Sequence, residues 1–400
     1  MFGSIYTGLT GMMAFSQGLD VISNNVANLN TPGYKGNDLL FQDIFYRYGL
    51  SSDSNANYPS SEIGNGVTGD RTLMREAQGE IRETGNQNDV AIDGNGLFIL
   101  RDGEDIYYTR AGQFEIDDDG YLVDRVNQAR VAGFEDGELV DINVSELGNN
   151  RPRATTEIIL TNNLSINGVE HEIPEVEVFD ALGGSHLIDL KFINDGDLWR
   201  VEITDDAENM IASDGEIRFR TDGSPEEGFN RFSFQLAPDD VPATEILLNF
   251  GEAGSFTGAT SFAAGETSDL VVESQDGYAR GALIRMGFDR DGTLTVEYSN
   301  GKDNESTQLA LAWFDDMQAL RQIGGGLFLA GEELEPMIDT PMQGVMGEIV
   351  EGSLELSNVE LTLEFTDLII MQRGFQGSSQ ILTVSNEMIQ QLLDIGRGGR

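Results

Sequence analysis

Apolar residues recur at every seventh position at both ends of the chain, a spacing typical of long helices that pack along a narrow seam. The N-terminal repeat consists of Ile5, Met12, Leu19 and Val26, with Leu9 on a companion row whose later members are polar. The C-terminal repeat has one longer apolar row and two apolar residues on its companion row: Leu361, Leu368, Phe375, Leu382 and Ile389, with Phe365 and Leu393. The pattern predicts one helix at each end of the chain.

The predicted C-terminal helix extends from Asn358 to Leu393, which is on the order of 50 Å at about 1.5 Å per residue. A helix with so narrow an apolar row buries too little surface to offset the conformational entropy lost when it orders. Both terminal helices should therefore need partners. These partners are either other copies of the chain or, as the simpler alternative, the two helices paired as an antiparallel hairpin within one copy.

The middle of the chain has the alternating pattern of β-strands instead of the helical period. Residues 113–123 and 284–298 each contain two alternating apolar runs around an Asp-Gly pair, which predicts two β-hairpins. Further short strands are predicted within four more segments: 175–195, 198–204, 216–223 and 231–237. The fold class is therefore expected to be mainly β and multidomain, with terminal helices that form a coiled-coil-like core domain.

The order of helix, strands and helix predicts domains nested inside one another. We expect a discontinuous helical domain of residues 1–70 and 353–400, and a discontinuous inner β-domain of residues 71–147 and 280–352. Residues 148–279 are expected to form an outer β-domain inserted into the inner one.

Charge separates the ends from the middle in the same way. The 400 residues carry a formal net charge of −45, yet residues 1–50 contribute only −1 and residues 353–400 only −3. The middle of the chain would repel nucleic acid phosphates and anionic lipid, so neither is an expected partner. The nearly neutral ends are suited to burial against protein, and the acidic middle to exposure.

The sequence contains no cysteine, which excludes disulfides and thiolate metal sites. The first basic residue is Lys35, so the charged start of a secretory signal is missing, and no apolar run has the length of a membrane span. We expect no membrane insertion and no cleaved signal peptide. An unprocessed N-terminus remains compatible with export by routes that read an unfolded segment.

Candidate sites for calcium and for catalysis fail on residue type. A calcium loop aligned on Gly292 would need Glu where Tyr298 stands, and one aligned on Gly120 would need Glu where Val126 stands. No Gly-x-Ser-x-Gly motif occurs, and the two histidines lie in polar strand-like segments without a second ligand type beside them. We therefore expect no catalytic residue, no metal site and no cofactor, and we expect that the protein is not an enzyme.

The stretch NNVANLNTPGYK, residues 24–35, places several asparagines at the end of the N-terminal repeat and stops at Pro32-Gly33, which predicts a type II turn. Together with the preceding LTGMMAFSQGLDVISN, it resembles the N-terminal signature of the bacterial flagellar axial proteins, the family that builds rod, hook and hook-filament junction. Five further segments resemble this family in the expected order: AIDGNGLFIL, YTRAGQFEIDDDGYLV, VFDALGGSHLIDLKF, LALAWFDDMQALRQIGGGLF and GSLELSNVELTLEFTDLIIMQRGFQGSSQIL.

The resemblance covers most of the chain and is greatest for the hook type of the family, since a shorter distal-rod member would be expected to lack residues 150–280 and the ALAWF stretch. Pro32 departs from the usual hook pattern and is shared with rod and junction members. The alternatives are a distal rod subunit, a straight drive shaft, and, from a different class, a secreted β-rich adhesin with helical ends.

What the resemblance implies is a self-assembling homopolymer, a curved tube that acts as a universal joint between motor and filament. It also implies localisation to the flagellar hook of the basal body, export by the flagellar type III apparatus, and contacts with rod, hook cap and junction proteins. The heptad residues named above would then be subunit-packing positions in the inner wall. Asn24, Asn25 and Asn28 would form hydrogen bonds there and fix the register, or else merely cap a solvated helix.

Overall fold

The computed structural model describes residues 2–48, 62–238 and 241–397. Contacts divide the chain into two compact units. Unit 1 comprises Met1–Ser145, Met286–Thr295 and Glu305–Arg400, and unit 2 comprises Glu146–Arg285 and Val296–Asn304. Residues 49–61, part of the predicted helical domain, lie outside the described residues. The finer separation of a helical domain from an inner β-domain stays a prediction.

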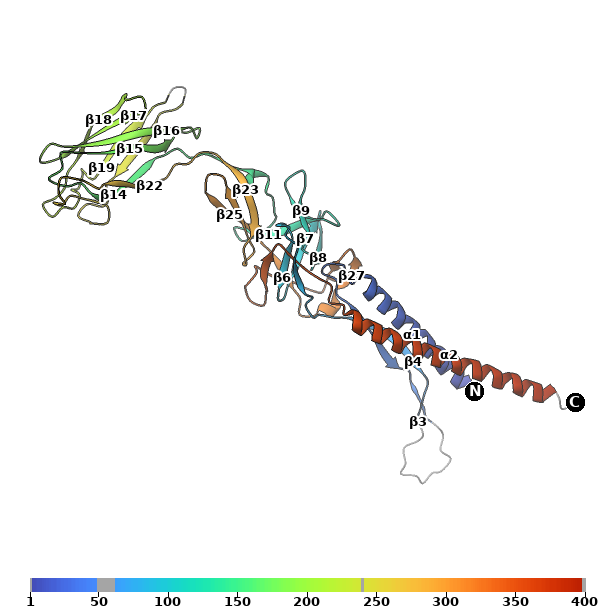
Figure 1. Cartoon of the computed structure of the whole chain (residues 1–400). Helices are drawn as coiled ribbons and strands as arrows, with labels where there is room; N and C mark the ends of the chain where they lie inside the picture. The colour runs from blue at the N-terminus through green and yellow to red at the C-terminus, as the bar shows by residue number, and fades with distance from the viewer. Residues whose placement is uncertain (1, 49–61, 239–240, 398–400) are drawn as a thin grey trace. The chain divides into compact units, whose positions relative to one another are not determined.

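Both predicted terminal helices are present, and strands occupy the sequence between them, so the mainly β fold with helical ends is confirmed (Figure 1). Helix α1 spans Phe2–Ala27 and α2 spans Leu361–Arg397. Helix α2 starts later than predicted because the side chain of Asn358 is hydrogen-bonded outside any helix. Its Oδ1 accepts from the Gly36 amide at 2.8 Å, and its Nδ2 donates to the carbonyls of Arg75 and Ala77, both at 2.8 Å.

The predicted turn after α1 is confirmed. Gly33 has a φ of 69°, and the Tyr34 amide donates to the Thr31 carbonyl at 3.3 Å. Pro32 and Gly33 are thus the two central residues of a turn whose third position requires a positive φ, which glycine adopts without strain. The turn directs the chain out of the helix and into the strands of unit 1.

Most strands of unit 1 are short. Those before residue 145 are β1 (Asn37–Asp43), β2 (Tyr46–Tyr48), β3 (Glu62–Gly64), β4 (Val67–Met74), β5 (Ile81–Glu83), β6 (Val90–Asp93), β7 (Leu97–Asp102), β8 (Asp105–Thr109), β9 (Phe114–Ile116), β10 (Leu122–Asp124), β11 (Arg130–Glu135) and β12 (Glu138–Asp141). Those after residue 305 are β26 (Leu311–Trp313), β27 (Arg321–Gly324), β28 (Leu327–Leu329), β29 (Met337–Asp339), β30 (Glu348–Glu351) and β31 (Ser353–Glu355). Three longer strands have residues in both units: β23 (Gly281–Phe288), β24 (Thr293–Tyr298) and β25 (Asp303–Leu309).

The core of unit 1 forms where segments distant in sequence share a sheet. Strand β7 pairs with β8, β11 and β26, so strands from both halves of the chain lie side by side. Tyr108 and Phe314 meet edge to face with ring centroids 4.8 Å apart, and Phe98 and Phe114 meet likewise at 5.1 Å. These buried contacts hold the strands of unit 1 together.

Unit 2 is built from two sheets that share one apolar core. One sheet has the order β15 (Glu170–Phe179), β16 (Ser185–Asn194), β17 (Trp199–Asp205) and β18 (Met210–Ile217). The other contains β14 (Glu157–Asn163), β19 (Arg231–Leu236), β20 (Thr244–Asn249), β21 (Ala259–Thr260) and β22 (Val271–Gln275), while β13 (Asn149–Asn150) pairs with β23. Alternate residues of both sheets, including Ile158, Phe192, Trp199 and Leu248, are buried together, as in a β-sandwich.

Both predicted hairpins are confirmed. Strands β9 and β10 pair antiparallel, with Leu122 opposite Ile116. Strands β23 and β24 are neighbours in their sheet, joined by a turn in which the Gly292 amide donates to the Asp289 carbonyl at 2.9 Å. Gly292 has a φ of 79°, which explains the Asp-Gly pair as turn chemistry.

Candidate functional site

Helices α1 and α2 pack against each other along a seam of small residues. Gly8 lies against Leu382, Gly11 against Ser378 and Gly18 against Met371. Residue numbers therefore decrease along α2 in the direction in which they increase along α1. The two helices are therefore antiparallel and side by side, as Figure 1 shows. A Cβ atom at Gly11 would lie 2.8 Å from the Ser378 hydroxyl oxygen, closer than side chains tolerate, so the glycines permit this close approach.

The antiparallel hairpin within one copy, which was the simpler of the two partner arrangements, is thus present. The contact between α1 and α2 buries only one side of each helix. The predicted packing residues Ile5, Met12, Leu19, Val26, Leu368, Phe375, Leu382 and Ile389 are half-buried. Four others remain exposed: Leu9 at 42%, Leu361 at 40%, Phe365 at 50% and Leu393 at 62%. The residues of α2 buried most deeply lie one position away from the expected companion row: Glu364, Ser378 and Ser385.

The outer surface of the helix pair carries many large exposed apolar side chains, which we call the assembly face: Tyr6, Leu9, Met13, Leu361, Leu363, Phe365, Ile369, Ile370, Ile381, Val384, Met388, Leu392 and Leu393. Met13 is 59% exposed and Ile370 is 55% exposed. Exposed apolar side chains in this number are typical of an interaction surface, because apolar surface is more stable buried against protein than left in water.

The asparagines at the end of α1 are hydrogen-bonded within the chain. Asn25 is 1% exposed; its Nδ2 donates to the Asn37 carbonyl at 2.8 Å, and its Oδ1 accepts from the Asn37 amide at 3.0 Å. Asn24 donates to the Tyr34 hydroxyl at 3.0 Å, and Asn28 donates to the Asn24 carbonyl at 2.9 Å. The amides therefore fold the chain back after α1, and a role for them between subunits stays a prediction.

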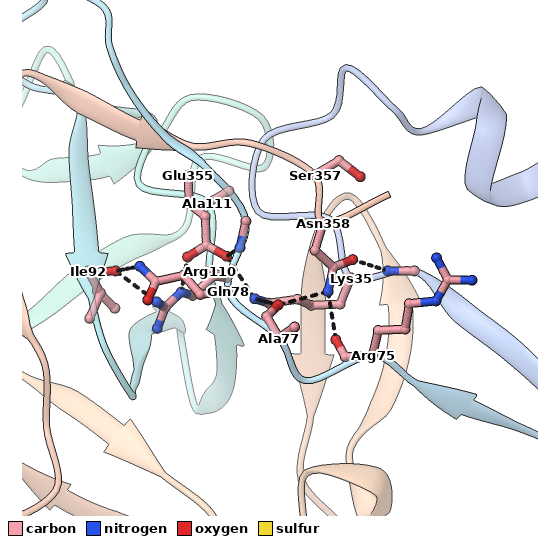
Figure 2. Close-up of polar contacts among 12 residues, drawn as sticks. Lys35, Arg75, Ala77, Gln78, Ile92, Arg110, Ala111, Glu355, Ser357 and Asn358 are labelled. Carbon is pink, nitrogen blue, oxygen red and sulfur yellow. Dashed lines mark hydrogen bonds and ion pairs between the residues drawn. The ribbon is translucent and has the colours of Figure 1, made fainter. Parts of the chain in front are cut away.

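A buried carboxylate, Glu355, joins the two ends of the chain beneath the helices. Figure 2 shows its side chain facing Arg110 and Lys35. Its Oε1 is 2.7 Å from Lys35 Nζ, and its Oε2 is 2.5 Å from Arg110 Nε. The Gly79 amide donates to Oε1 at 2.9 Å, and the Gly33 amide donates to the Glu355 main-chain carbonyl at 2.8 Å. Segments from four parts of the chain thus meet at one residue that is 1% exposed.

The two cations have further partners. Arg110 donates to the carbonyls of Ile92 at 2.7 Å, Gly94 at 2.7 Å and Gly96 at 2.5 Å, while Lys35 donates to the Ala77 carbonyl at 3.0 Å. Burial lowers the pKa of Lys35 from its ordinary 10.5, and the attraction of Glu355 offsets part of this effect. The guanidinium and carboxylate are held in fixed geometry by several hydrogen bonds, which is what makes such a pair tolerable inside a protein.

A second buried carboxylate, Glu364, anchors the start of α2. Its Oε1 is 2.7 Å from Arg75 Nη1, and Arg75 Nη2 is 2.5 Å from Asp38. Asn25 Nδ2 also donates to Glu364, at 3.3 Å. The hydrogen bond with Asp38 is the main cause of a raised pKa at Arg75, so this guanidinium stays charged. We call the residues around Glu355 and Glu364 the polar junction; it ties α1 and α2 to the strands of unit 1.

No local pattern in the sequence predicts the polar junction. One signal was available: the chain has only three lysines, and the nearly neutral ends contain few charged residues, among which are Lys35, Glu355 and Glu364. Charges in segments otherwise suited to burial are expected to be paired. Which residues pair could not be read, because Lys35 and Glu355 are separated by 320 positions.

Among the described residues, no group of three or more histidine, cysteine, aspartate or glutamate side chains is arranged to hold a metal ion. No helix in that part of the chain is long and apolar enough to cross a membrane. Both histidines have structural contacts: His186 Nε2 lies 2.8 Å from Asp180, and His171 Nε2 lies 2.7 Å from the Leu270 carbonyl oxygen.

Comparison with known families gives three matches in chain order. Residues 5–35 match the family described as flagella basal body rod protein, residues 91–166 match the flagellar hook protein FlgE/F/G D1 domain, and residues 350–395 match the flagellar basal body rod FlgEFG protein C-terminal. The first match includes most of α1, and the last includes Glu355 and most of α2.

Relatives match over almost the whole length. The flagellar hook protein FlgE of Treponema pallidum is 28% identical over 99% of this chain and 100% of its own. That of Borreliella burgdorferi is 26% identical over 98% and 99%, and that of Escherichia coli is 26% identical over 97% and 98%. The crystal structure of Helicobacter pylori flagellar hook protein FlgE2 aligns with a TM-score of 0.49 and 14% identity, covering 68% of this chain and 100% of that one. The chain belongs to the flagellar hook and basal body rod protein family.

Proposed function

We propose that the protein is the structural subunit of a flagellar hook, and that it polymerises into a curved tube which transmits motor torque to the filament. The observation that carries this proposal is the match to hook proteins over nearly the full length, including residues 148–279. A shorter rod subunit would lack part of that region. The role is structural and not enzymatic, and it needs no cofactor.

The assembly face accounts for polymerisation. One helix pair leaves Tyr6, Met13 and Phe365 about half exposed, and packing against other copies removes this apolar surface from water. Completing the burial of one half-exposed side chain of this size contributes roughly 1 kcal/mol, about half of the value for full burial, so several such contacts in each copy stabilise a polymer. The predicted packing residues Leu9, Leu361, Phe365 and Leu393 lie on this face and are available for the contact.

The polar junction accounts for torque transmission. A force applied to the helix pair reaches the strands of unit 1 through Glu355 and Glu364, whose ion pairs have fixed directions and are closed to water. Unit 2 carries most of its apolar side chains in its own core and presents an acidic surface. Its surface suits lateral movement past neighbouring copies, since inter-domain contacts that are small and polar slide most readily.

The remaining partners are part of the same proposal. The chain would leave the cell unfolded through the flagellar type III apparatus without a cleaved signal peptide, and would meet the rod, the hook cap and the junction proteins at the ends of the tube. The threefold division into residues 1–70 with 353–400, 71–147 with 280–352, and 148–279 is proposed as the inner, middle and outer layers of its wall.

Immunogold electron microscopy of isolated flagellar basal structures tests the proposal. An antibody raised against residues 150–270 should label the curved segment outside the cell envelope. Label restricted to the straight shaft within the envelope would instead assign the protein to the distal rod, and absence of label from every flagellar structure would reject the family assignment as a guide to function.

A further inference from the structure

A projecting aromatic side chain and an unfilled pocket occur on the same unit of the chain. Phe45 lies between β1 and β2 and is 86% exposed, the most exposed of the large apolar side chains in the described residues. A cavity of about 340 Å³ lies between the end of α1 and the turn of Gly324, Gly325 and Gly326, with Leu327 and Phe328 also in its lining. We call it the α1 pocket.

The position of Phe45 is fixed by the main chain beside it. The Ile44 amide donates to the Gly66 carbonyl at 2.9 Å, and Gly66 lies so close to α1 that a Cβ there would be 2.2 Å from the Thr10 hydroxyl oxygen. Gly66 has a φ of 120°, a backbone conformation that residues with a side chain rarely adopt. The main chain beside Phe45 is therefore held against α1 near Thr10, while the ring of Phe45 lies in water.

The α1 pocket lies farther along the same helix. Its rim includes Asn24 and Asn28, which are 14 and 18 positions beyond Thr10 in the sequence. At about 1.5 Å per residue, the level of Phe45 and the level of the pocket differ by roughly 20–30 Å along the helix axis. In this structure the ring of Phe45 is in solvent, so the pocket of its own copy does not hold it.

Two different surfaces that fit each other, offset along one axis, generate a head-to-tail contact that repeats from copy to copy. Such a contact produces a helical polymer instead of a closed dimer. We propose that Phe45 of one copy inserts its ring into the α1 pocket of a neighbouring copy, between Asn24 and the glycine turn. This inference rests on the proposed function, and it names a contact by which copies are joined.

Charge favours a second copy as the occupant. In a chain with a net charge of −45, most segments of a second copy repel the first. Residues 39–48 contain one acid, Asp43, and one base, Arg47, and are neutral overall. The pocket is lined by neutral residues apart from Lys35, whose ammonium group is paired with Glu355. Glycine at three successive wall positions leaves room for an aromatic ring to lie against the main chain.

Cysteine cross-linking tests the contact directly, because the natural chain contains no cysteine. Full-length Phe45→Cys is co-assembled with full-length Gln322→Cys, or with Asn24→Cys, and the polymer is oxidised. Gln322 of β27 and Asn24 of α1 are both exposed and both line the pocket. Since each chain carries one cysteine, a disulfide between the two different variants joins separate copies. Val126→Cys, at a site 62% exposed elsewhere on unit 1, replaces the rim variant as the control.

The proposal predicts a disulfide-linked heterodimer with at least one rim variant and none with Val126→Cys. It also predicts that Phe45→Ser raises the critical concentration for polymerisation about tenfold or more, since a Phe side chain no longer leaves water. Phe45→Leu should restore most of the loss, and Val126→Ser should change little.

The outcomes separate this inference from the proposed function. If the unsubstituted chain polymerises but neither rim variant is cross-linked and Phe45→Ser assembles normally, the contact is wrong and the hook assignment is unaffected. If the unsubstituted chain forms no polymer under any condition and labels no flagellar structure, the proposed function is wrong, and the contact is rejected with it.

Discussion

At the scale of single residues, the buried charges at the two ends of the chain lie where segments distant in sequence meet. Glu355 is bonded to Lys35, Arg110 and the Gly79 amide, and it is almost completely buried. An ion pair in this environment gains little net stability over an apolar contact, but removing one partner is costly because the other charge stays buried. The junction therefore contributes a unique arrangement of the chain ends more than it contributes raw stability.

Replacing Glu355 by Gln should destabilise unit 1 by about 3–5 kcal/mol, since two buried cations lose their carboxylate. The measurement is urea unfolding followed by fluorescence in a Trp199→Phe background, in which Trp313 of unit 1 is the remaining tryptophan. Glu115→Gln removes an exposed carboxylate that lies 3.9 Å from Arg125, and it should cost less than about 1 kcal/mol. Equal losses in the two variants would show that the junction is not a special site.

The lowered pKa of Asp276 predicts how the stability of unit 2 changes at acid pH. Burial alone would raise the pKa of this carboxyl, but hydrogen bonds from the Thr156 hydroxyl and from the amides of Glu157 and Thr156 outweigh it and hold the pKa below 3.8. A group whose pKa is depressed in the folded state contributes stability above its unfolded pKa, and this stability is lost as the pH falls below about 3.8.

The thermal midpoint of unit 2 should therefore fall steeply as the pH drops below about 4, and Asp276→Asn should flatten that fall while lowering the midpoint at neutral pH. Trp199 fluorescence in a Trp313→Phe background measures it. Asp206→Asn, at an exposed turn position, is the control and should leave the profile unchanged. A fall in Asp276→Asn as steep as in the parent would assign the acid sensitivity to other carboxyls.

At the scale of elements, the glycine seam decides how closely α1 and α2 approach. Gly11 faces Ser378, whereas Gly377, in the interior of α2, has open space around it. Both positions lie in the interior of a helix, so leucine gains about the same helix propensity over glycine at either one. The difference between the two substitutions therefore isolates the cost of forcing a side chain into the seam, which is typically 1–3 kcal/mol for overpacking.

Gly11→Leu should thus be about 1–3 kcal/mol less stable than Gly377→Leu. Circular dichroism at 222 nm measures this on the soluble, unpolymerised chain, since α1 and α2 are its two long helices in the described residues. If the two variants unfold together, the helices must separate easily, and the pair seen here would be weak before assembly.

The elements themselves could largely be predicted from the sequence, because heptads and Asp-Gly turns are local signals. Leu368, Phe375 and Leu382 lie in the long helix that their spacing predicted and are half-buried there, while their role in packing between subunits stays a prediction. The companion row was displaced by one position, since Phe365 is apolar and invites burial, yet the adjacent Glu364 is the residue that is buried. A buried Glu is favoured only because Arg75 and Asn25 are there to bind it, and no local pattern contains that information.

At the scale of the whole molecule, the negative charge is concentrated in the middle of the chain. The ends are nearly neutral and contain the assembly face, while the excess of acid lies in the middle of the chain. Surfaces with the same sign of charge repel weakly at close range and so resist adhesion between neighbouring copies. We expect the acidic surface of unit 2 to keep adjacent outer domains mobile as a hook bends.

Neutralising part of this surface should therefore stiffen or bundle hooks. Glu172, Asp197, Asp206 and Glu208 are exposed on unit 2, and they would be replaced together by Gln or Asn. The matched control exchanges Glu and Asp at the same positions, which keeps the charge. Electron microscopy of isolated hooks at low salt should show straighter or bundled hooks in the neutral variant alone, with slower swimming.

Because the Debye length is about 10 Å at 0.1 M and only about 3 Å at 1 M ionic strength, raising the salt should make control hooks resemble the neutral variant. Unchanged curvature and swimming in the neutral variant would instead assign the acidity to solubility, and the mobility of the outer domains would have to come from the shape of their contacts.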